Sequence, residues 1–185
     1  KPTNCDTAIV YVPVSAPVSE AVADNGTVVN GYTGGTSFTN VLLNDSLNHA
    51  LVISGQVTIS QVSTTNPKVS LSGTNVVVAA GTPAGNYTLI YEICDTLNPT
   101  NGYTTLVYVP VSSPVYEAVA ANAMVVNGYT GGTSFTNVLV NDSLNHALVI
   151  SGQVTISPVS TTNPKVSLSG TNVLVDWGTP AGNFT

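Results

Sequence analysis

The sequence predicts an all-β protein built from tandem immunoglobulin-like β-sandwich repeats of about 97 residues. Shifting the chain against itself by 97 residues matches 72 of the 88 overlapping positions, which is the signature of a tandem repeat. Short runs of Val, Ile, Thr and Tyr alternate with turn residues, which is typical of a sandwich with seven or eight strands per unit. No apolar period of 3.6 residues persists over three turns, so we expect no helices.

The most similar part of the two copies is a stretch of 30 residues. Gly31–Ser60 returns as Gly128–Ser157, and the only change is Val140 in place of Leu43. Because apolar residues make up 43% of the chain, each copy has enough of them to fill a core. Two domains of ordinary size are therefore expected.

Proline-marked joints near Pro17 and Pro114 set the expected domain boundaries. We expect 18–114 to be one complete repeat and 1–17 to be the terminal strand of a preceding repeat. Residues 115–185 are expected to form a second repeat that stops before its last hairpin. A neighbouring copy could insert its 1–17 segment there, or the chain could continue; continuation is favoured because a donor segment would fill only one of two missing strands.

The expected strands are rich in β-branched and aromatic residues and end at Gly, Pro, Asn or Asp turns. In chain order they are Thr7–Val14, Glu20–Val29 (interrupted at Asp24), Ser37–Leu43, Ala50–Ser63 (with a bend at Gly55), Val69–Leu71, Val76–Ala79, Tyr87–Cys94 and Tyr103–Val111.

The strand Tyr87–Cys94 is expected to be central in its sheet. Its alternation places Leu89, Tyr91 and Ile93 on one face together with Tyr87, and the other face also carries bulky residues. We expect it to form a hairpin with Tyr103–Val111.

Charge excludes one class of partner. Only 6% of the residues are charged, Arg is absent, and the net charge is −6. A surface that neutralises phosphates cannot be formed from three lysines, so nucleic acid is not an expected partner. No apolar run is long enough to span a membrane.

Two cysteines, Cys5 and Cys94, lie 89 residues apart and are not equivalent in the repeat, because Cys5 aligns with Gly102. The spacing indicates a hairpin-closing pair of which each copy keeps one member. We expect no disulfide within the chain, since the two cysteines belong to hairpins one domain apart.

Three phrases carry a resemblance to a known class of protein: NVLLNDSLNHALV, GTPAGNYTLIYEICDTLNPTN and CDTAIVYVPV. They resemble the tandem Ig-like and cadherin-like repeats of large Bacteroidota cell-surface adhesins, which are associated with gliding motility and type IX secretion. The resemblance covers essentially the whole chain. It implies an extracellular location at the cell surface or in a secreted filament.

Cadherin-like repeats bind calcium at their joints, so the resemblance also implies a candidate metal site. The residues that could supply oxygen ligands near one end of the first copy are Glu20, Asp24, Asn44, Asp45 and Asn48. The second copy replaces Asp24 with Ala121, and no D-x-D-x-D cluster is present. Solvated turn residues are the alternative interpretation.

Asp followed by Ser or Thr and then a small or branched apolar residue resembles the O-glycosylation motif of secreted Bacteroidota proteins. The candidate acceptors are Thr7, Ser46, Thr96 and Ser143. Asx turns use the same residue types and are the alternative.

Catalysis is not expected. Asp45, Ser46 and His49 contain the residue types of a triad, but triads converge from separate elements rather than from one loop. The chain is therefore interpreted as a structural repeat, a rigid spacer in an extracellular filament or adhesin stalk that contacts copies of itself head to tail. The alternative is a carbohydrate- or surface-binding module, for which Trp177 is the single aromatic hint.

Overall fold

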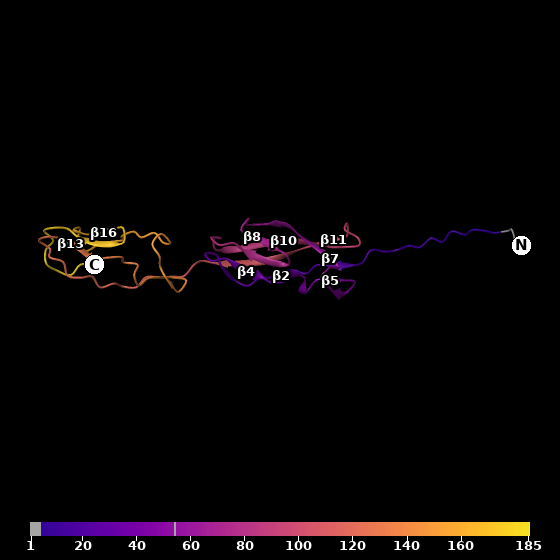
Figure 1. The fold of residues 1–185 in the computed structure, drawn as a ribbon, viewed down its shortest axis with the longest axis horizontal. Helices are drawn as coiled ribbons and strands as arrows, with labels where there is room; N and C mark the ends of the chain where they lie inside the picture. Colours follow the sequence, from indigo (N-terminus) through magenta and orange to yellow (C-terminus); the bar gives the residue numbers. More distant parts are fainter. Residues whose placement is uncertain (1–4, 54) are drawn as a thin grey trace. The chain divides into compact units, whose positions relative to one another are not determined.

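The computed structural model describes residues 5–53 and 55–185. Within these residues the secondary structure consists of strands and one short 3₁₀ helix, and none of their helices is long and apolar enough to cross a membrane. The chain divides into two compact units, Lys1–Ser113 and Pro114–Thr185 (Figure 1).

The larger sheet of the first unit contains five strands. They are β2 (Asp24–Asn25), β3 (Val29–Asn30), β7 (Val57–Thr64), β10 (Gly85–Asp95) and β11 (Gly102–Ser112). The sheet order is β2-β11-β10-β7, and β3 also pairs with β11. The long strands β10 and β11 form an antiparallel hairpin, whereas β2 and β3 run parallel to β11.

Two smaller sheets complete the first unit. One has the order β4-β9-β8 and the other has the order β1-β5-β6. Their strands are β1 (Ser19–Glu20), β4 (Gly35–Phe38), β5 (Ser46–Leu47), β6 (Ala50–Leu51), β8 (Val69–Ser72) and β9 (Asn75–Val78). The 3₁₀ helix η1 (Val41–Leu43) connects β4 to β5.

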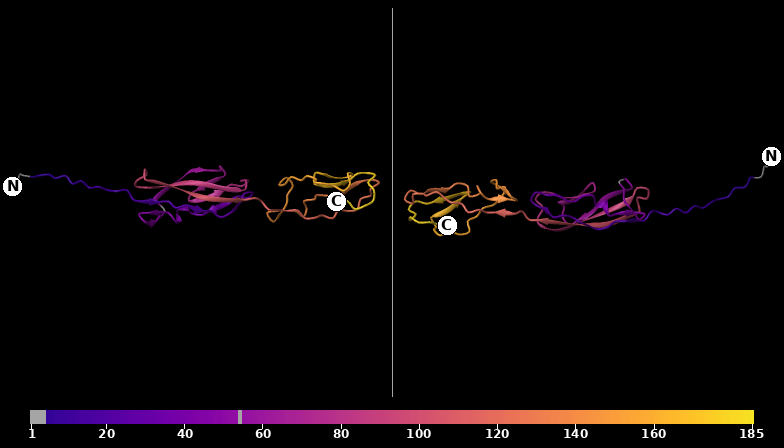
Figure 2. Two further views of the ribbon diagram at one scale, coloured as in Figure 1. Left: turned by 180° about the vertical axis from the view of Figure 1, so that it is seen from behind. Right: turned by 90° about the horizontal axis from the view of Figure 1, so that it is seen from below.

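The core of the first unit lies between the β10–β11 hairpin and the β4-β9-β8 sheet (Figure 2). The hairpin contributes alternate residues to it, as the period of two in a strand requires. The buried core side chains are Val29, Val41, Val57, Val69, Val76, Val78, Leu89, Tyr91, Ile93, Val107, Val109 and Val111. A two-layer β-sandwich results, so the predicted all-β, immunoglobulin-like fold class is confirmed.

The second unit has two three-stranded sheets, with the orders β12-β14-β15 and β13-β17-β16. The strands are β12 (Tyr116–Glu117), β13 (Gly132–Phe135), β14 (Ser143–Leu144), β15 (Ala147–Leu148), β16 (Val166–Ser169) and β17 (Asn172–Val175). They repeat β1, β4, β5, β6, β8 and β9, each shifted by 97 residues. Residues 121–122, 126–127 and 154–161, which match β2, β3 and β7, form no strand.

The central position of Tyr87–Cys94 is confirmed, because β10 lies between β7 and β11. The expected strand Glu20–Val29 is interrupted, as predicted, but not at Asp24, because Asp24–Asn25 form the strand β2 and the breaks lie on either side of it. It is broken into the short strands β1, β2 and β3, of which β1 pairs with β5 while β2 and β3 pair with β11. The segment 5–17 pairs with no described strand, although Thr7–Val14 has the residues of one. The domain boundaries near Pro17 and Pro114 stay a prediction.

Candidate functional site

A buried cluster of one tyrosine and two carboxylates lies in the core of the first unit. The Tyr91 hydroxyl is 3.3 Å from Asp24 Oδ2, 3.1 Å from Asp45 Oδ2 and 3.1 Å from the Val41 carbonyl oxygen. Tyr91 and Asp45 have no exposed surface, and Asp24 is 3% exposed. Buried carboxylates at this depth require hydrogen-bond partners, and the phenol supplies one.

Three separate elements bring these groups together. The alternation of β10 turns Tyr91 inward, as the sequence predicts, and β2 carries Asp24 beside β11. Asp45 follows η1, and its Oδ1 accepts a hydrogen bond of 2.8 Å from the Val22 N–H. Asp45 therefore connects the loop before β2 to the centre of the core.

The cluster has more acceptors than protons. A phenol carries one hydrogen, whereas three oxygens surround the Tyr91 hydroxyl. Burial raises the pKa of Asp24 to about 6, although the hydrogen bond from Tyr91 opposes the shift, and burial also raises the pKa of Asp45. Burial and the two carboxylates raise the pKa of Tyr91, which stays protonated. Below about pH 6, a proton on Asp24 supplies the donor that the cluster lacks.

The calcium candidates are only partly brought together. Asp24 and Asp45 share Tyr91, and the Asn44 side chain hydrogen-bonds Asp24. Asn48 instead accepts a hydrogen bond of 3.0 Å from the Val18 N–H, and the exposed Glu20 lies in β1. No group of three or more His, Cys, Asp or Glu side chains suited to a metal occurs in residues 5–53 and 55–185. Calcium binding stays a prediction, and calorimetric titration of the chain with Ca²⁺ tests it.

The four glycosylation candidates differ in accessibility. Thr7 and Thr96 are exposed, and the Thr96 hydroxyl donates to the Gln56 carbonyl at 3.0 Å. Ser46 and Ser143 lie half-buried in the short strands β5 and β14. Glycosylation itself stays a prediction.

The aspartates of these motifs hydrogen-bond nearby backbone and side chains. Asp95 accepts bonds from the Leu97 N–H at 3.0 Å and from the Asn98 side-chain amide at 2.6 Å, and these bonds lower its pKa. Asp142 accepts a bond of 2.8 Å from the Val119 N–H. The Asp95 contacts are the local turn bonds of the alternative interpretation, whereas the Asp142 bond joins residues 23 apart in the chain.

The triad residue types do not assemble. Asn48 and His49 both have positive φ and form the two-residue turn between β5 and β6, where His49 is exposed. Among the described residues no hydrogen bond joins Asp45 to Ser46 or His49. Cys5 and Cys94 both carry free thiols.

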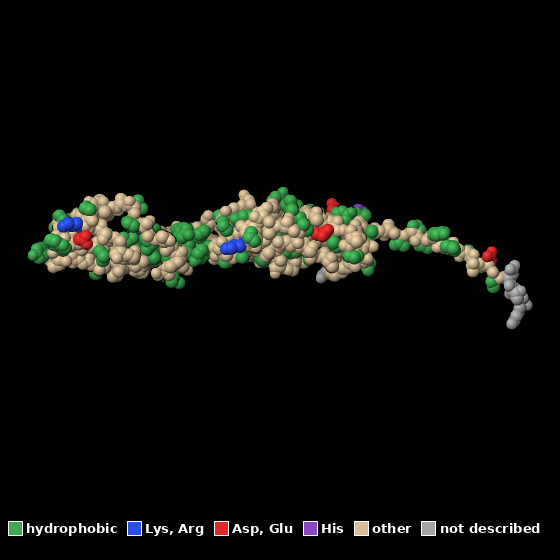
Figure 3. Space-filling view, turned by 90° about the horizontal axis from the view of Figure 1, so that it is seen from above, with side chains coloured by type: hydrophobic (Ala, Val, Ile, Leu, Met, Phe, Trp, Pro, Cys, Tyr) green, Lys and Arg blue, Asp and Glu red, His purple; other side chains and the backbone are tan. Residues whose placement is uncertain are grey.

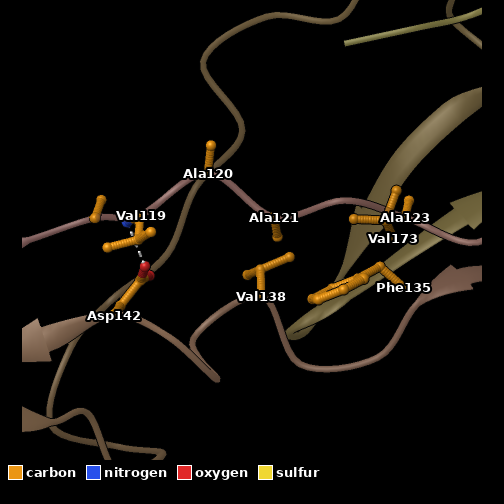
Figure 4. Close-up of a pocket in the computed structure, with 9 residues that line it drawn as sticks. Val119, Ala120, Ala121, Ala123, Phe135, Val138, Asp142 and Val173 are labelled. Carbon is orange, nitrogen blue, oxygen red and sulfur yellow. Dashed lines mark hydrogen bonds between the residues drawn. The ribbon is translucent and has the colours of Figure 1, made fainter.

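The second unit has an open pocket where the first unit has Tyr91. The repeat places the Tyr91 position at 188, and no residue of the printed chain stands there. A pocket of about 460 Å³ opens beside Phe135, Val138 and Asp142, which match Phe38, Val41 and Asp45 (Figure 4). The dashed line in Figure 4 marks the bond from the Val119 N–H to Asp142. The other wall is the segment 118–123, in which Ala121 replaces Asp24.

The sequence interpretation placed Tyr91 on the inner face but missed its hydroxyl as the centre of a network. Asp24 and Asp45 are candidate ligands in the sequence, yet nothing in their spacing indicates a shared partner, which lies 67 residues from Asp24 and 46 residues from Asp45. A tyrosine at an inward position of a core strand is the available signal, because a buried phenol needs a partner.

No protein-family model matches the sequence, and no curated protein matches it. Among solved structures, the chain is similar to extracellular cadherin domains 1–4 of protocadherin gamma B7, with 17% identity and a TM-score of 0.38 over 88% of this chain. It is also similar to the extracellular domain of protocadherin gamma B4 (15% identity, TM-score 0.31, 88% of this chain) and to cadherin domains 3–6 of protocadherin gamma B2 (13%, 0.33, 91%). The chain spans less than half the length of these three chains, at 41%, 29% and 44%.

Proposed function

We propose that this chain is a pair of structural repeats from an extracellular filament or adhesin stalk on a bacterial surface, where each sandwich acts as a rigid spacer. In a spacer, the chain must enter each unit at one end and leave it at the opposite end. The proposal also requires units that can follow one another with the same contacts.

The observation that carries the proposal is the path of the chain through the first unit. Asn101, directly before β11, donates a side-chain hydrogen bond of 2.7 Å to the carbonyl oxygen of Pro17. The chain leaves the same unit after Ser112, at the far end of β11. Because β11 has 11 residues, the two points are about 35 Å apart along the strand.

The strand β11 also gives the unit its stiffness. It pairs over ten residues with β10 and receives β2 and β3 on its other side. A stretching force applied between Pro17 and Ser112 therefore acts along β11. Several of the backbone hydrogen bonds between β11 and its neighbouring strands must then break at the same time. The near-identity of the two copies supports an array whose length is set by the number of copies.

Small-angle X-ray scattering tests the spacer proposal. The chain is extended by one and then by two further copies of residues 18–114, and its largest dimension is measured. We expect each copy to add a constant increment of roughly 35–45 Å. A largest dimension that stays nearly constant as copies are added would contradict a spacer.

If the chain is extracellular, as proposed, its Asp-Ser and Asp-Thr motifs are accessible to the glycosylation of secreted proteins. In material purified from its natural source, we expect hexose-containing mass on Thr7 and Thr96 first, because these two residues are exposed. Ser46 and Ser143 are less accessible in β5 and β14. An intact mass equal to that of the bare polypeptide would refute the proposal.

One observation favours the alternative, a carbohydrate-binding module. Trp177 exposes 74% of its surface, and the Lys165 ammonium lies 5.6 Å from its ring centroid. An exposed indole can stack on a sugar ring, but the first unit has Ala80 at this position. A glycan array with the native chain and the Trp177→Ala variant separates the two functions. Binding that disappears in the variant would support the module.

A further inference from the structure

We propose that the Asn101-Gly102 pair at the start of β11 is a site of spontaneous chemical modification, at which Asn101 loses ammonia and releases the chain entry held at Pro17. The modification converts an amide that donates a hydrogen bond into a carboxylate that donates none. This inference goes beyond the spacer proposal, because it depends on contacts inside the first unit alone.

The chemistry needs water and no other reactant. Asparagine is chemically labile, and most so before glycine, which has no Cβ to hinder its own nitrogen. The glycine nitrogen forms a bond to the asparagine Cγ, its proton passes to the side-chain nitrogen, and the Cγ–Nδ2 bond breaks to release ammonia. Water then opens the resulting succinimide at either imide carbonyl, which gives aspartate or isoaspartate. One water is consumed for each ammonia released, and nothing is oxidised or reduced.

The sequence contains four Asn-Gly pairs, and the fold restrains three of them. Asn25 lies in β2 and Asn30 in β3, and both strands pair with β11. The N–H groups of Gly26 and Gly31 donate to carbonyl oxygens of β11 at 2.8 and 2.9 Å, so each nitrogen must break this bond before it can attack. In the second unit, the Asn127 carboxamide oxygen accepts a hydrogen bond of 2.9 Å from the N–H two residues on, which fixes it in a turn.

The nitrogen of Gly102, in contrast, lies outside the strand ladders. The Asp95 N–H donates to the Asn101 carbonyl oxygen at 3.5 Å, so Cys94 and Gly102 form a pair without mutual hydrogen bonds. The Gly102 N–H therefore points away from β10. On the other side of β11, pairing begins only at Val107, so within residues 5–53 and 55–185 no strand pairs with Gly102 there.

A hydrogen bond to the chain entry restrains the Asn101 side chain. Its Nδ2 donates to the Pro17 carbonyl oxygen at 2.7 Å. Ring closure requires this bond to open, so the reaction starts from the state in which the entry is already released. The product carboxylate has no N–H to donate, and its charge would face the carbonyl oxygen if the entry returned. The reaction therefore makes a reversible opening permanent.

Two other hydrogen bonds continue to hold the entry after the reaction. The Val18 N–H donates to Asn48 Oδ1 at 3.0 Å, and the Asn48 N–H donates to the Val18 carbonyl oxygen at 2.7 Å. These bonds attach the entry to the turn between β5 and β6, whereas the Asn101 bond attaches it to β11. Conversion of Asn101 therefore detaches the entry from the long β10–β11 hairpin and leaves it held by a short turn.

Each conversion also adds one negative charge to a chain that has few charges. Only 6% of the residues are charged, and the net charge is −6. Figure 3 shows the acidic and basic side chains widely scattered over the face that it presents. Anion-exchange chromatography should therefore separate converted chains from unconverted ones.

Ageing of the full chain tests the site. The chain is incubated in warm, mildly alkaline buffer, its charge variants are separated, and peptic peptide maps locate the converted residues. We expect Asn101 to convert at least about threefold faster than Asn25 or Asn30, because those two lie in paired strands and their attacking nitrogens must break a backbone bond. The same incubation in urea is the control, in which the three rates should become similar. Conversion of Asn101 no faster than the others, or a preference that persists unchanged in urea, would overturn the proposal.

Hydrogen exchange of the Val18 N–H, followed by NMR on the full chain, tests the release of the entry. Asn101→Asp should speed this exchange by about threefold or more, because the entry loses a hydrogen bond. Asn86→Asp is the matched control, since it adds the same charge at an exposed position of β10. Unchanged exchange in Asn101→Asp, or an equal change in the control, would contradict the release.

A second variant links the release to the chemistry. Asn101→Gln keeps a side-chain amide but must close a larger ring, so it should resist conversion. Ageing should therefore speed the exchange of the Val18 N–H in the native chain and leave it unchanged in Asn101→Gln. Faster exchange in both aged chains would show that the entry loosens for a reason other than the conversion of Asn101.

Discussion

At the scale of single residues, the Tyr91 hydroxyl is the centre of a buried polar cluster. It lies within hydrogen-bond distance of two carboxylates and one carbonyl oxygen inside an apolar core. The charge buried in this core therefore depends on whether Asp24 is protonated. A proton supplied by the solvent makes the stability of the first unit depend on pH.

Replacing Asp24 with Asn should remove most of this dependence. The pKa of Asp24 is about 6 in the folded protein and ordinarily 3.8, so the folded state binds the proton more tightly than the unfolded chain. The free energy of unfolding should therefore fall as the pH rises from about 4 to about 7. Urea unfolding at several pH values measures the slope. Asp6→Asn, at an exposed position, is the control, and a native chain more stable at pH 7 than at pH 4.5 would contradict the argument.

Removing the Tyr91 hydroxyl should lower the stability of the first unit. Tyr91→Phe keeps the ring but leaves Asp24 and Asp45 without their shared donor, and a buried acceptor that loses its partner costs about 1–3 kcal/mol. Tyr108→Phe is the control, because Tyr108 is half exposed. Chemical unfolding followed by circular dichroism measures both variants. Equal effects in the two would show that the cluster contributes nothing specific.

At the scale of elements, identical residues form different structures in the two copies. VTIS opens β7 in the first unit, yet the same four residues, 154–157, form no strand in the second. Within residues 5–53 and 55–113, β10 is the only strand that pairs with β7, and the described residues of the second unit contain no counterpart of β10. A strand needs a neighbour for its backbone groups, so local propensity alone does not form it.

The β10–β11 hairpin should accept a designed disulfide. Cys94 pairs with Gly102 in the register, and a Cβ built on Gly102 would lie 2.9 Å from Cys94 Sγ. Gly102→Cys should therefore bond to Cys94 after a small movement of the Glu92 side chain, and closing this short loop should add about 2–3 kcal/mol. Peptide mapping without reduction, and unfolding with and without reductant, measure the bond and its effect. A free thiol at position 102 after oxidation would contradict the predicted register.

At the scale of the whole molecule, the two units differ in how much core they bury. Within residues 5–53 and 55–185, twelve buried hydrophobic side chains form the core of the first unit, whereas Leu139 and Leu144 are the ones that the second unit buries. The second unit therefore has much less hydrophobic stabilisation.

Unfolding should consequently occur in two steps. Trp177 is the single tryptophan and reports on the second unit, while far-UV circular dichroism is dominated by the long strands of the first. We expect the fluorescence transition at a lower urea concentration than the dichroism transition. Appending a copy of residues 89–113 after Thr185 adds a counterpart of the β10–β11 hairpin to the second unit and should move the fluorescence transition upward. Coincident transitions in the native chain would contradict unequal units.

The sequence by itself determined the fold class, the period and the central strand of this protein. These follow from patterns that act locally: alternation in Tyr87–Cys94, turn residues between short strands, and self-similarity at 97 residues. The tertiary structure decided how Glu20–Val29 is divided, because its pieces pair with different strands. It also decided that Asp24 and Asp45 share Tyr91, since that contact joins residues far apart in the chain through packing that no local pattern encodes. For the same reason identical residues form a strand in one unit and none in the other: a strand is stable only when its partner is present.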